Sequence, residues 1–510
     1  MSFFEELKKT LDNEFNTSVT ENGAVGYRTT GKELLDLNFA VSSLRNMSDF
    51  EVVKRFARAY FDGKELAVKW LFFAGDVRGG MGERRLFRLG LLFLAHYEPE
   101  LCARLIPLVP EYTRWDNLWC LLDTPLCDKV CALVKRTLDD DLAKMSGKKP
   151  VSLLAKWLPS ANTSSKKTRA YARIIMNKLG YGEREYRKTL SALRAYADVV
   201  EVKMSSDRWN KIKYSAVPSR ANVIYKDAFL LHDEKRRKQY LAALKNGETK
   251  INSGVLFPHD IVNKYCTRCG TLSDIDVALE QMWKALPDYV KGDDTTICVT
   301  DGSGSMTSCV GGGRLTCLTV ANALTVYFAE RCKGAFENKY ITFSERPKLV
   351  DFSKCDTLRD KITVAYAHSE VANTNIEAVF DLILRTAVRA KMKQSDLPAN
   401  VLVLSDMEFD YCVEGKDGKL VTDRALFDVI AEKYAEHGYK LPRLVFWNIC
   451  SRTGTIPVRE NALGVALVSG FSPAVVEMVL GGKLDPYECL LDRLASPRYD
   501  AVDAILKNKK

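Results

Sequence analysis

A short run of β-branched and apolar residues, Thr296 to Thr300, constrains the fold of this 510-residue chain more than any other feature. Such a run is typical of a buried strand. It ends on Asp301, and the next four residues place two hydroxyls, those of Ser303 and Ser305, among glycines. A tight turn at the end of a strand thus presents one carboxylate and two alcohols. All three are hard oxygen ligands, which suit Mg²⁺ or Mn²⁺ better than zinc or copper.

The segment that follows alternates predicted strands with predicted helices. Apolar runs at 340–343, 401–404, 444–447 and 464–468 predict strands, and stretches 315–331 and 377–392 predict amphipathic helices. This alternation predicts an α/β domain over residues 295–510, with a doubly wound, largely parallel sheet. Ligands gather at the carboxyl ends of such strands, so we expect Thr374 and Asp406 to lie near Asp301. The alternative is that these polar groups only cap turns and helices.

The spacing of Asp301, Ser303 and Ser305 resembles the metal-ion-dependent adhesion site of von Willebrand factor type A (vWA) domains. The resemblance implies one set of hydroxyl and carboxylate ligands for Mg²⁺, made of Asp301, Ser303, Ser305, Thr374 and Asp406. It also implies an open coordination position that accepts an acidic residue of a protein partner. Glu408 and Asp410 follow closely and either assist the ion or close the site as a built-in ligand.

Residues 1–290 predict a separate, mostly helical domain. Apolar residues recur there at three- and four-residue spacings, in segments such as 50–61, 66–74, 84–96 and 170–178. The polar residues Lys291–Asp294 separate this half from the first buried strand. We therefore expect two domains, 1–290 and 295–510, that fold independently of each other.

The positive charge of the chain is concentrated in the helical half. The whole chain carries 75 Lys and Arg against 65 Asp and Glu, whereas residues 301–510 carry 27 of each. Residues 151–250 alone hold 22 basic and 9 acidic residues. A solvated helical surface is the simplest explanation, but a concentrated surplus of one sign favours an anionic partner, and nucleic acid first.

Three basic stretches of the helical half are distinctive. Glycines at 79, 80 and 82 precede two arginines, which either bind phosphate or act as a structural clamp. Further on, Trp157 stands among cations and hydroxyls and either stacks on a base or belongs to the core. The run Lys235–Lys238 is expected to be solvated. The candidate RNA-binding residues are Lys156, Lys166, Lys167, Arg169, Arg173, Arg84 and Arg85.

Four motifs upstream of the metal motif carry a wider resemblance: RGGMGERRLF (78–87), KWLP (156–159), YRKTLSALR (186–194) and FPHDIV (257–262). They look like an uncharacterised family in which a helical half precedes a vWA-like half. Its layout is similar to that of Ro autoantigen-type, or TROVE (telomerase, Ro and vault), proteins. In those proteins HEAT-like helical repeats form a ring that a vWA domain closes. The resemblance implies a single-stranded or structured non-coding RNA as the partner of the helical half.

Other classes of protein are disfavoured. The longest apolar runs fall short of the roughly 18–20 residues that span a bilayer, so no membrane segment is expected. The first residues lack the regions of a secretory signal, and the fourteen cysteines show no disulfide framework. Both observations favour reduced thiols and a cytoplasmic location. A lone C-x-x-C at 266–269 has no second ligand pair that would complete a zinc site.

These observations favour a non-enzymatic, RNA-binding scaffold that couples a basic helical body to a Mg²⁺-binding vWA-like domain. The alternative is a metal-dependent protein adhesion or assembly module without RNA. A metal-dependent nuclease or phosphatase is disfavoured, because no His or Lys belongs to the constellation and could serve as its general base.

Overall fold

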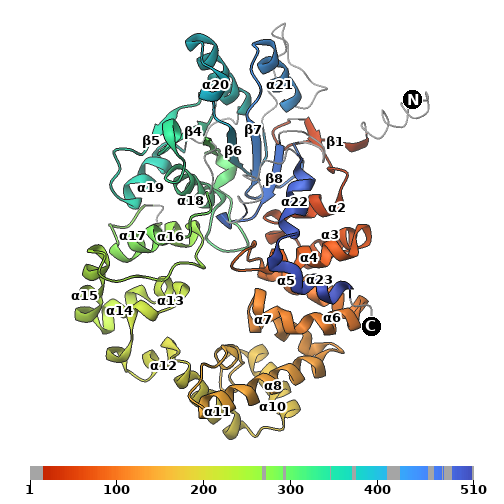
Figure 1. Cartoon of the computed structure of the whole chain (residues 1–510), viewed down its shortest axis with the longest axis vertical. Coiled ribbons are helices and arrows are strands. Elements are labelled where there is room, and N and C mark those ends of the chain that lie inside the picture. The colour runs from red at the N-terminus through yellow and green to blue at the C-terminus, as the bar shows by residue number, and fades with distance from the viewer. Residues whose placement is uncertain are drawn as a thin grey trace. The chain divides into compact units, whose positions relative to one another are not determined.

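The computed structural model describes residues 15–23, 25–266, 271–290, 295–344, 346–369, 375–409, 426–457, 465–473, 475 and 485–507. They belong to two compact units (Figure 1). The first unit comprises residues 1–64 and 256–495, and the second comprises residues 65–255 and 496–510. No helix in the described ranges is long and apolar enough to cross a membrane.

The first unit is built on a six-stranded mixed sheet. Its strands are β3 (Thr296–Asp301), β4 (Lys339–Phe343), β5 (Leu349–Asp351), β6 (Asn400–Ser405), β7 (Arg443–Asn448) and β8 (Val465–Ser469). The spatial order is β5-β4-β3-β6-β7-β8, and all neighbours are parallel except β4 and β5. Every residue of β3, β6 and β8 is buried, which explains their near-continuous apolar sequences.

Helices before, between and after the strands belong to the same unit as this sheet. They are α16 (Pro258–Tyr265), α17 (Val277–Lys284), α18 (Cys317–Ala329), α19 (Leu358–Ala367), α20 (Ile376–Ala390), α21 (Leu426–Glu436) and α22 (Pro486–Leu494). Side chains cap several of their first turns: the side chain of Thr316 accepts from the Thr319 amide, and that of Asp485 accepts from the Tyr487 and Glu488 amides. The mixed sheet and its helices confirm the predicted α/β class of this half of the chain.

The chain order of the strands reverses at β3. The chain leaves β3 for β4 on one side of the sheet, and it later returns to β6 on the other side. The carboxyl ends of β3 and β6 are therefore neighbours at the point where the connections diverge. In open α/β sheets this is the position where ligands bind.

The N-terminal segment belongs to the same unit as the sheet. It contains β1 (Thr17–Val19), β2 (Val25–Tyr27), α2 (Glu33–Ala40) and α3 (Asp49–Asp62). The backbones of Tyr27 and Ile456 exchange two hydrogen bonds of 2.8 Å. After α2, the buried Ser42 hydroxyl donates to the Asn448 carbonyl at 3.0 Å and accepts from the Gly470 amide at 2.7 Å. The segment is thus attached to the carboxyl ends of β7 and β8.

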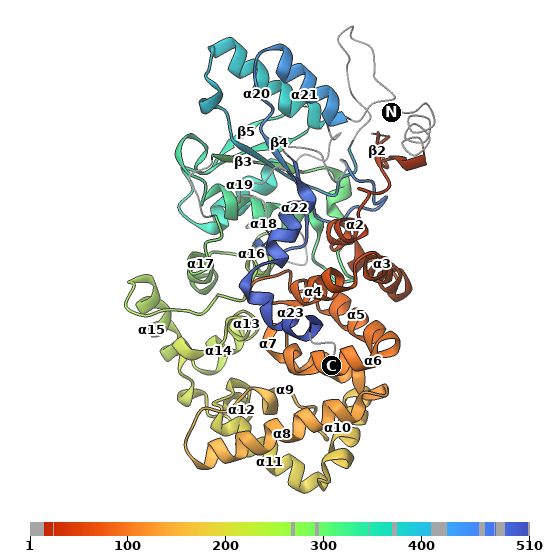
Figure 2. The ribbon, with the colours of Figure 1, turned by 45° about the vertical axis from the view of Figure 1, so that its right-hand side comes forward.

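The second unit is helical. Its helices are α4 (Lys64–Gly75), α5 (Arg84–Tyr97), α6 (Pro99–Leu105), α7 (Val109–Tyr112), α8 (Cys127–Ser146), α9 (Leu154–Trp157), α10 (Lys166–Leu179), α11 (Glu183–Tyr196), α12 (Val200–Ser205), α13 (Ser219–Ile224), α14 (Lys226–His232), α15 (Glu234–Lys245) and α23 (Asp500–Lys507). Helices α8, α10 and α11 lie side by side in both ribbon views (Figures 1 and 2). The chain's last segment joins this unit, since Arg498 donates to the fully buried Asp76 at 2.6 Å.

The boundaries of the two units differ from the expected division into 1–290 and 295–510. Two interactions explain the difference within the first unit. The carboxylate of Glu280 on α17 accepts from the Leu358 amide at the start of α19 at 2.8 Å, and Ser42 binds the ends of β7 and β8. Such contacts are invisible to composition, because they join residues that lie far apart in the sequence. The independent folding of residues 295–510 stays a prediction.

We expect the Ser42→Ala substitution to lower the free energy of unfolding by roughly 1–3 kcal/mol, because it leaves the buried Gly470 amide without an acceptor. Urea unfolding checks this. The control is Ser206→Ala on the exposed end of α12, where the expected change is within about 0.5 kcal/mol. Equal stability of the two variants would show that Ser42 does not anchor the N-terminal segment.

Candidate metal site and basic surface

The Asp301 carboxylate lies at the carboxyl end of β3 and is fully buried. One carboxylate oxygen accepts from the Ser303 amide at 2.9 Å, and the other accepts from the Ser405 hydroxyl at 2.6 Å. Ser405 is the last residue of β6, so the second hydrogen bond crosses between the two strands at the reversal point. The sheet itself therefore fixes the position of this carboxylate.

The hydroxyls predicted to bind the ion lie beside each other. The Ser303 and Ser305 oxygens are 2.9 Å apart, and Ser305 hydrogen-bonds the Asp406 carboxylate. Asp406 is buried and is followed by Met407 in a left-handed backbone conformation, with a φ of 64°. Such a conformation is uncommon for a residue other than glycine and is found where the surrounding structure enforces it.

Four of the five predicted metal ligands are thus joined by hydrogen bonds or lie against one another, namely Asp301, Ser303, Ser305 and Asp406. The fifth, Thr374, lies outside the described residues, as does Asp410. In the described part of the chain, no group of three or more His, Cys, Asp or Glu side chains could hold a metal ion. A site here therefore depends on hydroxyl ligands as well as carboxylates.

The electrostatics of this cluster fit a cation. Burial and the charge of the neighbouring Asp406 raise the pKa of Asp301 to about 7. Burial also raises the pKa of Asp406, and the Glu408 charge adds to the effect. Arg452 lies 3.7 Å from Asp406, but it also pairs with Glu21 at 2.5 Å. Two buried carboxylates whose ionised forms repel each other are the arrangement that a divalent cation relieves.

Glu408 has a role that the sequence did not reveal. Its buried carboxylate accepts from the amides of Glu21, Arg452 and Thr453, at 2.8, 2.8 and 2.9 Å. The Thr453 hydroxyl is 3.0 and 3.1 Å from its two oxygens. Both oxygens therefore bind the loop after β7 and the N-terminal segment. Since these partners lie 45 and 387 positions away in the sequence, no local signal marks them.

The candidate RNA-binding residues of α10 fall into two groups. Lys166, Lys167 and Arg173 are exposed, and none of them pairs with a carboxylate among the residues that the structure describes. Arg169 instead donates to the Thr163 and Ser164 carbonyls, at 2.8 and 3.3 Å. It therefore serves the local fold of the loop before the helix.

The remaining candidates already have partners in the second unit. Lys156 is 3.4 Å from the Glu201 carboxylate, and Arg84 binds Asp116 at 2.6 Å. Arg85 is half-buried and interacts with another residue of the chain. The glycine-rich loop before these arginines is closely packed, because a Cβ on Gly80 would meet the Phe73 carbonyl oxygen at 1.9 Å. The structure therefore favours the structural clamp over phosphate binding at Arg84.

Two aromatic–cation arrangements complete the basic region. Trp157 is half-buried, and the Arg114 guanidinium covers its ring at 3.9 Å. The prediction that the run at 235–238 is solvated is wrong for Arg237, which is completely buried. Its guanidinium lies about 5 Å from the rings of Tyr214, Phe229 and Tyr240, where aromatic faces replace water around the charge.

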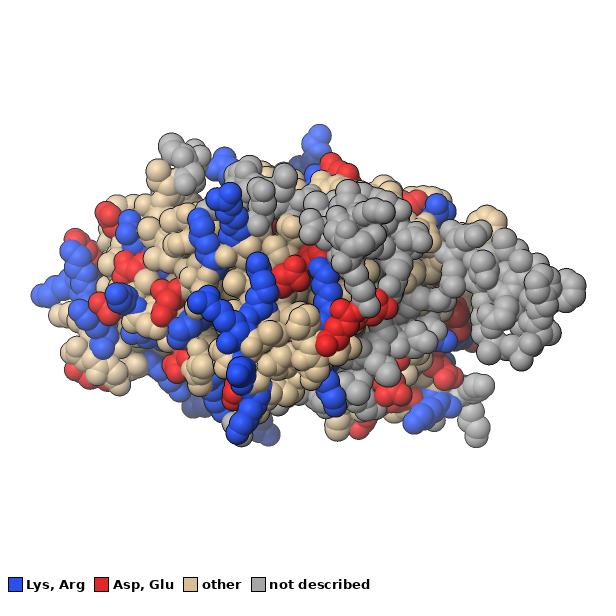
Figure 3. All heavy atoms as spheres, turned by 90° about the horizontal axis from the view of Figure 1, so that it is seen from above, with Lys and Arg blue, Asp and Glu red and all other residues tan. Residues whose placement is uncertain are grey.

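A second group of exposed cations lies in the first unit. Lys and Arg side chains gather in the middle of the face seen in Figure 3, which looks down on the end where α20 and α21 lie in Figure 1. Arg385, Arg389 and Lys393, on and just after α20, are exposed. They provide an internal comparison for the cations of α10.

Comparisons with known proteins match both halves of the chain to uncharacterised families. Residues 124–292 match the domain of unknown function DUF2828, and residues 295–493 match the domain of unknown function DUF7788. The uncharacterised protein L728 of Acanthamoeba polyphaga mimivirus is 28% identical over 519 residues, which cover 93% of this chain and 87% of that protein. The two domain matches meet between residues 292 and 295.

We expect Mg²⁺ to raise the midpoint of thermal unfolding of the parent protein, because a ligand that binds only the folded state stabilises it by about 2.7 kcal/mol at a hundredfold excess over Kd. Asp301→Asn should abolish this response to Mg²⁺. The matched control is Asp62→Asn, which changes an exposed carboxylate of the same unit and should respond as the parent does. An unchanged Mg²⁺ response in Asp301→Asn would exclude this site.

The raised pKa of Asp301 predicts a pH dependence for the metal-free protein. Between about pH 4 and pH 7 the folded state holds the Asp301 proton more tightly than the unfolded state does, so the free energy of unfolding falls as pH rises. The loss is complete above about pH 7. Urea unfolding at pH 4 and pH 8 should show a steeper fall in the parent than in Asp301→Asn, by on the order of 1–4 kcal/mol. Parallel profiles would contradict the assigned pKa.

Proposed function

We propose that this protein is a non-enzymatic, RNA-binding scaffold in which helix α10 provides the contact with the RNA backbone. The observation that carries the proposal is the group of three exposed cations on α10 without a carboxylate partner in the described ranges. Several exposed cations on other helices of this unit are neutralised instead: Lys135, Lys144 and Lys238 pair with Asp139, Asp140 and Glu234. The α10 cations therefore keep their full charge for a partner.

The geometry of α10 suits a phosphate backbone. Lys166 and Arg173 are seven positions apart, so they lie on one helical face, where Ala170 between them is also exposed. Lys167 lies beside the ring of Tyr171, at 5.6 Å. The first turn of α10 carries no acidic side chain, so its positive dipole end adds to the charges of the lysines. Contacts of this kind bind RNA without reading its sequence.

The cluster at the sheet adds a second binding function to this proposal. By its resemblance to vWA domains, Asp301, Ser303, Ser305 and Asp406 would hold Mg²⁺ or Mn²⁺, and Thr374 would complete the set. A bound ion would supply an open coordination position to a carboxylate of a protein partner. We also propose, from the same resemblance, that the helices of the second unit are related to the HEAT-like repeats of TROVE proteins.

A metal-dependent protein adhesion module without RNA is the second candidate. The observation that favours it is the pair of buried carboxylates beside two hydroxyls, because oxygen ligands of this kind suit a cation rather than RNA. Under this alternative, the α10 cations would be ordinary solvated charges. The two candidates differ in their response to salt, because phosphate binding weakens steeply with ionic strength.

We expect replacement of Lys166, Lys167 and Arg173 together by Gln to weaken binding to unrelated single-stranded RNAs almost uniformly. The reason is that each lost phosphate contact removes the entropy of counterion release. The slope of log affinity against log salt should become shallower by about 0.7 for each lost contact. Fluorescence anisotropy of labelled RNA over a salt series measures both quantities.

Three controls make this test specific. Replacing Lys135, Lys144 and Lys238 by Gln removes the same charge from cations on other helices that are already paired, and it should have a smaller effect. Replacing Arg385, Arg389 and Lys393 by Gln tests the cations of the first unit. Asp301→Asn should leave RNA affinity unchanged. RNA binding that is equal in the parent and the α10 variant would exclude this surface, and no binding by the parent would favour the adhesion module.

A further inference from the structure

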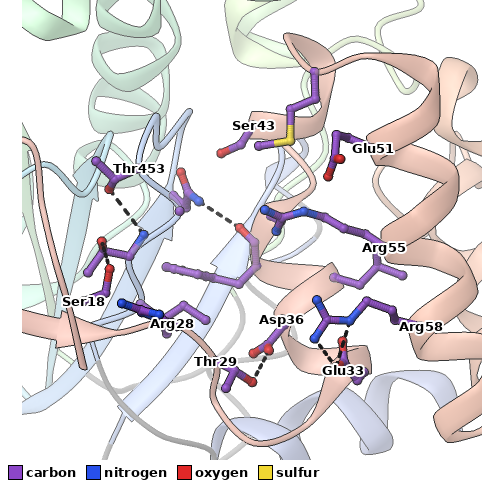
Figure 4. Close-up of a pocket in the computed structure, with 18 of the residues that line it drawn as sticks. Ser18, Arg28, Thr29, Glu33, Asp36, Ser43, Glu51, Arg55, Arg58 and Thr453 are labelled. Atoms are coloured by element: carbon purple, nitrogen blue, oxygen red, sulfur yellow. Dashed lines mark hydrogen bonds and ion pairs between the residues drawn. The ribbon is translucent and has the colours of Figure 1, made fainter. Parts of the chain in front are cut away.

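A pocket of about 230 Å³ lies within the first unit, and none of the four candidate metal ligands described above lines it. Its walls come from β1, the residues just after β2, α2, α3, and the end of β7 with the loop that follows it (Figure 4). Arg28 approaches from the strand side, while Arg55 and Arg58 extend from α3 on the opposite side. The role that we assign to this pocket does not depend on RNA binding or on the metal ion.

The hydrogen-bond acceptors that line the pocket are already engaged. The Glu33 carboxylate accepts from Arg58 at 2.5 and 3.0 Å. The Asp36 carboxylate accepts from the Thr29 hydroxyl and, at 2.7 Å, from the Thr30 amide. Glu51, on α3, pairs with Lys54 at 3.4 Å.

The donors, by contrast, are not all engaged. Arg55 is half-buried and has no hydrogen-bond or ion-pair partner in the part of the chain that the structure describes. Arg28 donates through Nε to the Thr17 carbonyl at 3.1 Å, and its two terminal nitrogens have no partner among the described residues. The Ser43 hydroxyl is only 3% exposed and lacks any hydrogen bond there.

A buried hydroxyl without a partner and a half-buried guanidinium without a counter-charge both carry a free-energy cost in a folded protein. Both face one pocket, and a ligand that supplies acceptor oxygens would remove both costs. The two uncompensated guanidinia carry two positive charges, which match a phosphate monoester, with its charge of about −1.5 to −2, better than a single carboxylate. Leu37, Phe39 and Met47 also line the pocket and offer apolar contact to an organic group.

We propose that this pocket binds the phosphate monoester of a small molecule, with Arg55 and Arg28 contacting the phosphoryl oxygens and Ser43 donating a hydrogen bond. Arg58 stays paired with Glu33 and forms part of the wall. Neither the metal cluster nor the α10 surface takes part in this site.

Isothermal titration of the full chain with inorganic phosphate, phenyl phosphate and benzoate tests the proposal. We expect saturable binding of both phosphates, tighter for phenyl phosphate because its ring reaches the apolar wall, and weaker binding of benzoate. Arg55→Gln should lower the affinity for phenyl phosphate about 10- to 100-fold, since it removes charge-assisted hydrogen bonds of about 1.5–3 kcal/mol. Absence of phosphate binding by the parent, or equal binding of benzoate and phenyl phosphate, would overturn the assignment.

Two further variants separate ligand binding from folding. Ser43→Ala removes a hydroxyl that makes no hydrogen bond in the described residues, so stability in urea should not fall, whereas the affinity for phenyl phosphate should fall several-fold. Arg389→Gln, on α20, removes the same charge as Arg55→Gln and should bind as the parent does. If Arg55→Gln or Ser43→Ala binds phenyl phosphate as tightly as the parent, the proposed contacts are wrong.

Discussion

The hydrogen bond between Ser405 and Asp301 is the interaction on which the candidate metal site depends. It joins the last residue of β6 to the last residue of β3, and both positions are fully buried. Burying a carboxylate is unfavourable unless hydrogen bonds or opposite charges compensate for it. Here two hydrogen bonds hold Asp301, and a second carboxylate lies close enough to raise its pKa. The same features that make the site unfavourable when empty therefore make it suitable for a divalent cation.

A second buried carboxylate, that of Glu408, is compensated by hydrogen-bond donors of the chain, without an ion. Donors from the loop after β7 and from the Glu21 amide surround it. Only one residue lies between Asp406 and Glu408, yet the left-handed turn at Met407 places them in different surroundings, one beside the Ser305 hydroxyl and one among backbone amides. Glu408 also binds the N-terminal segment, because its side chain accepts from the Glu21 amide and its backbone carbonyl accepts from the Asn22 side chain.

The sequence predicted the parts of the structure that depend on local pattern. Asp301, Ser303 and Ser305 fall within five residues, and Asp406 follows a strand run that must end at the same edge of a parallel sheet. Charge was less informative, because sequence gives the sign of a side chain but not its partner. Arg169, Lys156 and Arg84 bind groups within their own unit, whereas Lys166, Lys167 and Arg173 stay exposed. The burial of Arg237 could not be foreseen, since its aromatic surroundings form only when α14 and α15 pack.

The first unit thus contains two polar sites of opposite character. The cluster at β3 and β6 contains carboxylate and hydroxyl oxygens, and a positive charge would stabilise it. In the pocket between α2 and α3, the carboxylates already accept hydrogen bonds, whereas some of the donors have no partner among the described residues. A ligand with acceptor oxygens would bind those donors. Residues 15–64 contribute Arg28, Ser43 and Arg55 to the pocket, and their Glu21 amide binds Glu408, two positions after Asp406. An anion bound in the pocket would therefore stabilise the attachment of this segment to the sheet, because ligands that bind only the folded state shift the folding equilibrium towards it.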